Sequence, residues 1–265
     1  MGWLQRACYV VYTGPCAKII SYILGTLCGG ASVLLALQPN AAHINDRNTQ
    51  LMNTYRCIKD CPEALITALQ ALAAGGCTKE KYNALRARYN DKMTADENDV
   101  EEAALLIYLN FYCHHRMYRT NKRGLFNSSY NYTTRDFSVT AERIQALSQY
   151  MKASDVQIKN TNFDTFLADV SAGDFVYMDP PYLPVTESLK FNEYTAHKFN
   201  YDDHALLAQV FRRLDAIGAY VMVSNSNVPA VYDLYSGYNI QPVTVRRVFQ
   251  VKNQRQDTEL LITNY

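Results

Sequence analysis

The sequence predicts an α/β protein, built on an open, doubly wound sheet that is interrupted by a helical insertion. Three observations support this prediction. From residue 156 onward, strand-like and helix-like stretches alternate, as in a sheet with crossover helices. Residues 49–114 instead carry apolar side chains at helical spacing. The chain ends in two strand-like stretches, 243–251 and 259–263, around a polar turn at 252–257, which predicts a closing β-hairpin.

The amino-terminal half is expected to be mostly helical. We expect a short helix at 17–24, a helix at 31–37 after the Gly29-Gly30 pair, and a strand at 41–45 that ends before Asp46. The insertion, residues 51–155, is expected to carry most of the helices, namely those at 49–74, 79–92, 98–114 and 140–152. Thr94 and Glu97 offer a capping box for the third of these. The stretch 118–135 is polar, aromatic and irregular, which is typical of a recognition loop.

The carboxyl-terminal part completes the predicted sheet. Strands are expected at 156–160, 174–178 and 219–223, and helices at 165–170 and 201–217. The chain therefore divides into residues 1–50 and 156–265, which form the sheet domain, and the insertion between them. Ligands of doubly wound sheets bind at the carboxyl ends of the strands, where this sequence places Asp46 and Asp179.

Composition limits the compartment and the partners. Apolar residues make up 48% and charged residues 19%, which is enough for a sizeable core, and the net charge of +1 demands no polyanionic partner. Residues 110–160 carry a surplus of basic side chains, which fits either a phosphate-facing surface or a solvated face. The seven cysteines show no CxxC spacing and indicate a reducing, cytoplasm-like compartment. The apolar stretch 19–37 contains several glycines and hydroxyl residues, so we expect no membrane span.

The stretch 175–184, FVYMDPPYLP, carries the clearest chemistry. A strand that runs into Pro180 and Pro181 cannot continue its ladder, because neither residue has an N–H. The carbonyls of Asp179 and Pro180 can then point at a ligand, Asp179 adds a carboxylate, and Tyr182 adds a flat ring. This group suits an exocyclic amine on an aromatic ring, with two acceptors for its two hydrogens. The alternative is a rigid strand-exit turn.

These residues resemble the catalytic motif of the Dam-type (D12 class) DNA adenine-N6 methyltransferases. The likeness runs from about residue 42 to the carboxyl terminus. It includes the following further positions: Leu109, Asn110, Arg119, Asn121, Gly124, Phe126, Asn127, Phe191, Tyr194, Phe199, Ser224, Asn225 and residues 259–265. The resemblance implies a Rossmann-like methyltransferase sheet with an inserted target-recognition domain. It also implies methyl transfer from S-adenosylmethionine to an adenine flipped out of double-stranded DNA, with Asp179, Pro180, Pro181 and Tyr182 as catalytic residues.

The resemblance also implies a set of cofactor-binding residues: Tyr12, Lys18, Cys28, Gly29, Gly30, Asp46, Asn162, Phe163 and Asp179. Within this set, Asp46 would hold a ribose diol, and its alternative role is to cap the helix that begins near Asn48. The sequence departs from the family in two places. Thr26 stands where the family has an acid before the glycine-rich turn, and the spacer between Lys18 and Cys28 is short.

For DNA, the family's target-recognition segment corresponds to Arg116, Met117, Arg119, Asn121, Lys122 and Arg123. Arg119 is expected to read a base, since its fork matches guanine O6 and N7, and the other basic residues are expected to contact phosphates. Met117 occupies the position of an apolar wedge. Arg246, Arg247, Lys252 and Arg255 form either a second phosphate clamp or a solubilising edge. His114 and His115 lack further ligands at suitable spacing, so no metal is expected.

Three functions remain open from the sequence. The first is a DNA adenine-N6 methyltransferase that acts on double-stranded DNA as a monomer or weak dimer, in the cytoplasm of a bacterium or of a phage-infected host. The second keeps the chemistry but changes the substrate to RNA or single-stranded DNA. The third is a methylase-like DNA-binding protein with impaired cofactor binding, which the short spacer would explain. The sequence does not give the target, and the stretch Cys113–Arg116 departs from the family, so GATC is not assumed.

Overall fold

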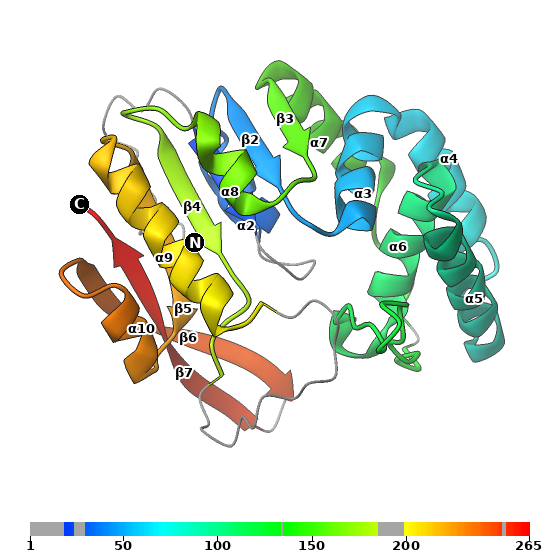
Figure 1. Cartoon of the computed structure of the whole chain (residues 1–265). Coiled ribbons are helices and arrows are strands. Elements are labelled where there is room, and N and C mark those ends of the chain that lie inside the picture. Colours follow the sequence, from blue (N-terminus) through cyan, green and yellow to red (C-terminus); the bar gives the residue numbers. More distant parts are fainter. Residues whose placement is uncertain (1–18, 24–29, 134, 185–198, 251–252) are drawn as a thin grey trace. The chain divides into compact units, whose positions relative to one another are not determined.

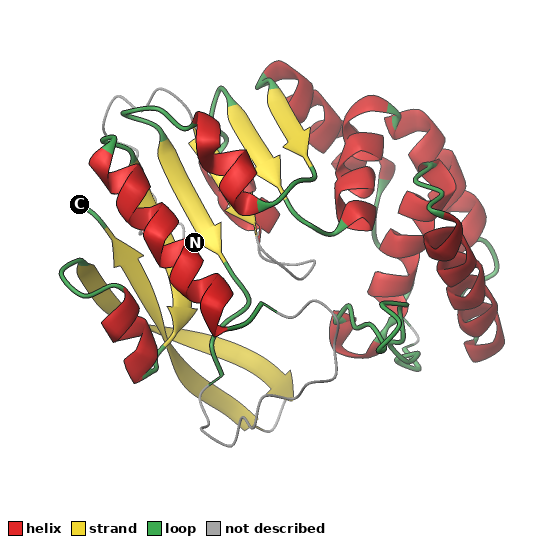
Figure 2. Cartoon of the chain, viewed as in Figure 1, coloured by secondary structure: helices red, strands yellow, loops and turns green. Residues whose placement is uncertain are grey.

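A computed structural model describes residues 19–23, 30–133, 135–184, 199–250 and 253–265 (Figures 1 and 2). It is a mixed α/β structure that divides into two compact units. The first unit comprises Met1–Arg47 and Thr161–Tyr265, and the second comprises Asn48–Asn160. Among the described residues, no helix has the length and apolar character needed to cross a membrane.

The first unit is built on a mixed sheet. Its strands follow the spatial order β2 (Ala42–Asn45), β1 (Ile19–Ile23), β4 (Phe175–Asp179), β5 (Tyr220–Ser226), β7 (Asn253–Thr263) and β6 (Asn239–Gln250). The first four of these strands are parallel, β7 is antiparallel to β5, and β6 and β7 form the expected hairpin. The turn expected at 252–257 is wrong, because residues 253–257 belong to β7 and pair with β6. Since β2, β1 and β4 are parallel neighbours, their carboxyl ends share one edge of the sheet.

Side chains alternate between the two faces of this sheet, and each face has its own apolar cluster. On one face, Phe175, Tyr177, Met222 and Leu261 pack with Val33 of helix α2 (Gly30–Leu37). On the other face, alternate residues of β4, β5 and β7 pack against helices α8 (Phe163–Phe166), α9 (Tyr201–Ala216) and α10 (Pro229–Leu234) and the 3-10 helix η2 (Leu167–Asp169). Helices therefore cover both faces of the sheet (Figure 2).

The second unit is mainly helical. It contains α3 (Thr49–Asp60), α4 (Pro62–Ala73), α5 (Lys79–Ala95), α6 (Val100–Tyr112), the 3-10 helix η1 (His114–Arg116), α7 (Ala141–Ala153) and the strand β3 (Val156–Lys159). Helix α6 packs against α3, α4 and α5, and much of its side-chain surface is buried. The carbonyl of Val156 accepts a hydrogen bond from Lys59 Nζ at 2.7 Å, which ties β3 to α3. This unit therefore has an apolar core of its own.

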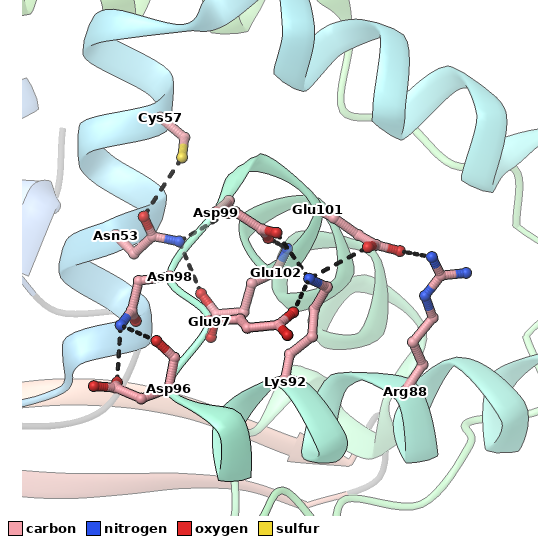
Figure 3. Close-up of polar contacts among 10 residues, drawn as sticks. All are labelled: Asn53, Cys57, Arg88, Lys92, Asp96, Glu97, Asn98, Asp99, Glu101 and Glu102. Carbon is pink, nitrogen blue, oxygen red and sulfur yellow. Dashed lines mark hydrogen bonds and ion pairs between the residues drawn. The ribbon is translucent and has the colours of Figure 1, made fainter.

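A polar network joins α3, α5 and α6 inside the second unit (Figure 3). Lys92 Nζ contacts Glu97, Asp99 and Glu101 at 2.7, 2.8 and 3.3 Å. Glu102 is only 1% exposed and accepts a hydrogen bond from Asn53 Nδ2 at 2.8 Å. Burial is the main cause that raises its pKa to about 7, so Glu102 holds a proton into the neutral range.

The chain passes from one unit to the other twice, and hydrogen bonds within each unit join the two connecting segments. Within the first unit, Asn45 donates from Nδ2 to the carbonyl of Thr161 at 2.9 Å and accepts from the Thr161 N–H at 2.8 Å. Within the second unit, Thr49 Oγ1 donates to Asn160 Oδ1 at 3.0 Å. The segment that leaves the sheet unit and the segment that returns to it are therefore held together.

Most expected elements are confirmed with shifts of a few residues, but several predictions are wrong. The described part of the helix expected at 17–24 is strand β1, which pairs with β2 and β4 on its two sides. The run Ile19-Ile20-Ser21-Tyr22-Ile23 is β-branched and aromatic, which suits a strand paired on both sides. The helix expected at 49–74 is two helices, because Pro62 cannot donate to the helix before it and begins α4 instead.

A further wrong prediction is the capping box at Thr94 and Glu97. Asp96 ends α5 in a left-handed conformation, and the N-cap of α6 is Asp99, whose side chain accepts from the Glu102 N–H at 2.8 Å. The alternative cap role of Asp46 is also wrong, because Asn48 caps α3 by accepting from the Leu51 N–H at 3.0 Å. Short polar side chains are abundant near both helix starts, so the sequence alone did not identify the capping residue.

Candidate active site and nucleic-acid interface

The end of β4 presents Asp179 at the carboxyl edge of the sheet. Asp179 Oδ1 accepts a hydrogen bond from Ser224 Oγ at 2.6 Å. The Ser224 hydroxyl also lies 3.1 Å from the Tyr177 hydroxyl. Since Ser224 has one hydrogen and gives it to the carboxylate, Tyr177 is the donor in the second contact. A chain of two hydroxyl groups therefore orients the Asp179 carboxylate.

Tyr182 is held at its hydroxyl end. Its hydroxyl donates to Glu259 Oε2 on β7 at 3.0 Å. Burial is the main cause that raises the pKa of Tyr182 well above its ordinary value, and the charges of Asp179 and Glu259 add to the effect. The hydroxyl therefore remains a protonated donor, and the half-buried ring is anchored beside Asp179.

The backbone that follows Asp179 is clamped by buried polar side chains. Asn225 Oδ1 accepts from the Leu183 N–H at 3.1 Å and from the Ser226 N–H at 2.9 Å. The Ser226 hydroxyl donates to the Leu183 carbonyl. Both hydrogen-bonding groups of the Leu183 backbone are thus satisfied from β5, which fixes the path of the chain after the two prolines.

His204 of α9 completes this clamp. It is 1% exposed, its Nδ1 lies 3.5 Å from Asn225 Nδ2, and the Phe199 ring packs edge-on against it. Burial lowers its pKa to about 4, against the opposing effects of Asp203 and of the Pro181 carbonyl. The imidazole is therefore neutral at ordinary pH, with one nitrogen accepting from Asn225 and the other donating to the Pro181 carbonyl.

The predicted cofactor residues are only partly described. Asp46 directly follows β2 and is 2% exposed, so it is a buried carboxyl at the same sheet edge as Asp179. Gly30 begins α2, and Asn162 precedes α8. The Phe163 ring is 6% exposed and packs in the α9-side cluster. Tyr12, Lys18, Cys28, Gly29, Thr26, Phe191 and Tyr194 lie outside the described residues.

The predicted recognition segment forms a tight hairpin-like loop in the second unit. Thr120 pairs with Phe126, and Cys113 pairs with Tyr130. Asn121 shapes the tip, because its Oδ1 accepts from the backbone N–H groups of Arg123 and Leu125 at 2.8 and 3.1 Å. All six predicted DNA-contacting side chains are exposed: Arg116, Met117, Arg119, Asn121, Lys122 and Arg123.

The base of this loop is fixed to α5. Asn90 accepts from the Phe126 N–H at 2.9 Å and donates to its carbonyl at 3.0 Å, and Tyr82 donates to the Ser128 carbonyl at 2.9 Å. The Ser128 hydroxyl in turn donates to the Met117 carbonyl at 2.6 Å and accepts from the Arg119 N–H at 3.1 Å. A rigid base with exposed basic side chains suits recognition of DNA.

Two predictions on charged groups remain predictions. Arg246, Arg247 and Arg255 lie on the strands of the hairpin, Lys252 is outside the described residues, and the phosphate-clamp role is untested. Among the described residues there is no cluster of three or more His, Cys, Asp or Glu side chains that could hold a metal ion.

Sequence reasoning did not assign roles to several residues that the structure brings to the site. Ser224, Asn225 and Glu259 were noted only as points of resemblance, and Tyr177, His204 and Ser226 were not singled out. A polar run such as Ser224-Asn225-Ser226 at the end of an apolar strand was an available signal, since buried polar groups need partners. His204 gave no such signal, because its helical spacing is equally compatible with an exposed position.

The chain is similar to characterised proteins over most of its length. The sequence profile of the family "D12 class N6 adenine-specific DNA methyltransferase" matches residues 27–249. The type II methyltransferase M1.LlaDCHI of Lactococcus lactis subsp. cremoris is 35% identical over 89% of this chain and 84% of its own length. The type II methyltransferase M.MjaIII of Methanocaldococcus jannaschii is 34% identical, over 94% and 89%.

A DNA adenine methylase of Serratia marcescens is 26% identical over 83% of this chain and 79% of its own length. In this chain, strand β4 ends at Asp179, directly before Pro180-Pro181-Tyr182, and the loop of the second unit exposes basic side chains. The chain therefore belongs to the D12 class of N6 adenine-specific DNA methyltransferases, and it is an enzyme that methylates adenine in DNA.

Proposed function

We propose that the enzyme transfers a methyl group from S-adenosylmethionine to the N6 amine of an adenine flipped out of duplex DNA, with Asp179, Pro180, Pro181 and Tyr182 at the reacting amine. The observation that carries this proposal is the strand exit at Asp179, where an oriented carboxylate, two prolines and an anchored aromatic ring follow one another. We also propose that the first unit is a Rossmann-like methyltransferase sheet, with residues 51–155 as an inserted target-recognition domain.

The residues at the carboxyl edge of the sheet fit the proposed methyl donor. Asp46 and Asp179 are carboxyl groups that follow β2 and β4, and β1 lies between these strands. Carboxylates accept hydrogen bonds from ribose hydroxyls and favour a nearby cation, so Asp46 would hold the ribose and Asp179 would lie toward the sulfonium. Bound S-adenosylmethionine would supply an electrophilic methyl group. Gly30, Asn162 and Phe163 would complete the described part of this site.

The chain's own groups supply orientation and electrostatic stabilisation. Asp179 and the Pro180 carbonyl would accept the two amine hydrogens, and Tyr182 would stack on the base. As the new N–C bond forms and the bond from the methyl group to sulfur breaks, positive charge would develop on the amine nitrogen. The Asp179 carboxylate would stabilise that charge until the nitrogen loses one proton to solvent. The Ser224 hydroxyl at 2.6 Å keeps the carboxylate oriented before the reaction. No covalent bond to the protein is needed.

Target recognition is proposed for the loop of the second unit. Arg119 would read a guanine edge, Met117 would wedge beside the displaced base, and Arg116, Lys122 and Arg123 would contact phosphates. Asn121 would act by holding the loop tip, since its Oδ1 already accepts two backbone hydrogen bonds. The four exposed basic side chains support a nucleic-acid substrate, because they provide a phosphate-binding surface.

The experiment is a methyl-transfer assay with radiolabelled S-adenosylmethionine and three substrates: duplex DNA, single-stranded DNA and RNA. We expect labelled N6-methyladenine in the duplex, complete loss in Asp179→Ala, and unchanged activity in the exposed control Asp233→Ala. Greater transfer to RNA or to single-stranded DNA would overturn the duplex assignment. Retained DNA binding without any transfer would instead support a protein with impaired cofactor binding.

A further inference from the structure

Strands β5 and β7 bring Ser224 and Glu259 to the sheet face that carries Asp179. In the parallel pair β4 and β5, Tyr177 lies opposite Met222, and two residues further along each strand are Asp179 and Ser224. In the antiparallel pair β5 and β7, Ser226 lies opposite Glu259. Because alternate residues share a face, these side chains gather at one place, although they are up to 82 positions apart in the chain (Tyr177 to Glu259).

We infer that Ser224 and Glu259 are positioning residues, which hold the Asp179 carboxylate and the Tyr182 ring in one fixed arrangement for the target adenine. This inference rests on the proposed roles of Asp179 and Tyr182. Ser224 acts through its 2.6 Å hydrogen bond to Asp179 Oδ1, and Glu259 acts through the 3.0 Å hydrogen bond that it accepts from the Tyr182 hydroxyl. Neither residue needs to touch the base.

The geometry explains what each contact restrains. The Ser224 hydroxyl is fully buried and is itself contacted by Tyr177, so it fixes the rotation of the Asp179 carboxylate. The Tyr182 hydroxyl lies at the far end of the ring, so its bond to Glu259 stops the ring from swinging about its Cα–Cβ bond. The acceptor for the amine and the surface for the base are therefore fixed before substrate binds.

The choice of a carboxylate at Glu259 argues against a purely structural role. Glu259 is 8% exposed and lies close enough to the Tyr182 hydroxyl for its charge to act on the same group as Asp179. A buried carboxylate costs more to desolvate than a neutral acceptor would. Local choices that cost stability are expected at functional sites. At this site, the carboxylate would contribute a negative environment near the proposed position of the amine, where positive charge develops.

The test is a double-mutant cycle on the rate of methyl transfer at saturating DNA and S-adenosylmethionine. We expect Tyr182→Phe and Glu259→Leu each to lower kcat by about tenfold, the factor for one hydrogen bond to a charged group. The double variant should fall no further than the slower single variant, because both changes remove the same contact. Glu259→Gln keeps an acceptor but removes the charge, so it should recover part of the rate that Glu259→Leu loses. Ser224→Ala should lower kcat by a similar factor with KM unchanged.

Tyr235→Phe is the matched control. Tyr235 is a buried tyrosine of the same unit, and its hydroxyl has no hydrogen-bond partner among the described residues, so its loss should leave kcat unchanged. Three outcomes would overturn the inference. They are a double variant whose loss of kcat equals the product of the two single losses, no recovery of kcat in Glu259→Gln, and losses of kcat that follow the folded fraction measured by circular dichroism. Activity retained in Asp179→Ala would instead overturn the proposed function, and a wild-type protein without transfer would overturn both.

Discussion

The side-chain amide of Asn90 exchanges two hydrogen bonds with the backbone of Phe126, at 2.9 and 3.0 Å, much as a neighbouring strand would. The Phe126 side chain is 1% exposed, and its ring packs edge-on against Tyr89, 5.8 Å away between centroids. One helical side chain thus connects the folded helices of the second unit to the loop proposed to contact DNA.

Asn90→Leu is expected to destabilise the protein and to loosen target recognition. It leaves the N–H and carbonyl of Phe126 without partners, at about 1–3 kcal/mol for each unsatisfied group. The unfolding midpoint in urea should fall, and discrimination between target and non-target duplexes should narrow. Asn83→Leu is the control, because Asn83 is exposed on the same helix. Equal effects of the two changes would contradict the anchoring role of Asn90.

The specificity and affinity of DNA binding should respond to different residues of the loop. Arg119→Ala should relax base preference at one target position by about 1–3 kcal/mol. Lys122→Ala should weaken binding equally on all sequences and lower the salt slope by about one unit. Titrations of target and scrambled duplexes at several salt concentrations separate the two effects. A uniform loss in Arg119→Ala would refute its role as a base reader.

Asp46→Asn is expected to weaken S-adenosylmethionine binding without changing DNA binding. The substitution removes the charge of a buried carboxyl while it keeps an acceptor oxygen, so a loss of about tenfold in affinity is expected. Isothermal titration with the cofactor alone measures this loss. Asn48→Asp keeps the helix cap and provides a control two residues away. Unchanged affinity in Asp46→Asn would exclude Asp46 from the cofactor site.

Glu102 makes stability depend on pH in an unusual direction for an acid. Its folded pKa of about 7 exceeds the ordinary value of 4.5, so the unfolded chain releases this proton first as pH rises. This group therefore contributes about 3 kcal/mol to the free energy of unfolding below pH 4.5, and this contribution is lost as the pH rises to 7. Glu102→Gln should abolish this slope and stabilise the protein at pH 8. Urea unfolding across pH, with the exposed Glu63→Gln as control, measures the difference.

His204 gives the opposite slope at lower pH. Its folded pKa of about 4 lies below the ordinary value of 6.5, so the unfolded chain binds the proton first as pH falls. The contribution of His204 to the free energy of unfolding is fully present above pH 6.5 and is lost progressively as the pH falls toward 4. His204→Gln should remove this acid sensitivity. Because Gln can still donate to the Pro181 carbonyl, methyl transfer at pH 7.5 should drop less than in His204→Leu. Equal rates of methyl transfer in His204→Gln and His204→Leu would refute the role of His204 in holding the backbone at Pro181.

Prediction from sequence succeeded where one local pattern decides the structure. The strand into Asp179 and its exit at Pro180 follow from β-branched residues and from the missing N–H groups of proline. The helix α9 was expected at 201–217, and the structure adds a capping box between Asn200 and Asp203 that the sequence analysis did not identify. The family was also recognisable, because the motif and its surroundings occur together.

Prediction failed where tertiary pairing decides the structure. The run at β1 suits a helix or a strand until two parallel neighbours take its backbone groups. The contacts among Asp179, Ser224, Tyr182 and Glu259 depend on strand order, and no local spacing reveals which strands become neighbours. Helix α10 (Pro229–Leu234) was missed because six residues are too few for a periodic signal.

The paired hydrogen bonds at Asn45–Thr161 and Thr49–Asn160 have a consequence for how such enzymes diversify. Because hydrogen bonds join the outgoing and returning chain segments within each unit, the two ends of the stretch between them are adjacent, and this stretch can be exchanged as one segment. An exchange of residues 48–160 would leave the pairings of β1 with β2 and β4, and of β4 with β5, intact. New target sequences could then be acquired by exchange of the segment proposed to recognise DNA, while the chemistry is inherited unchanged.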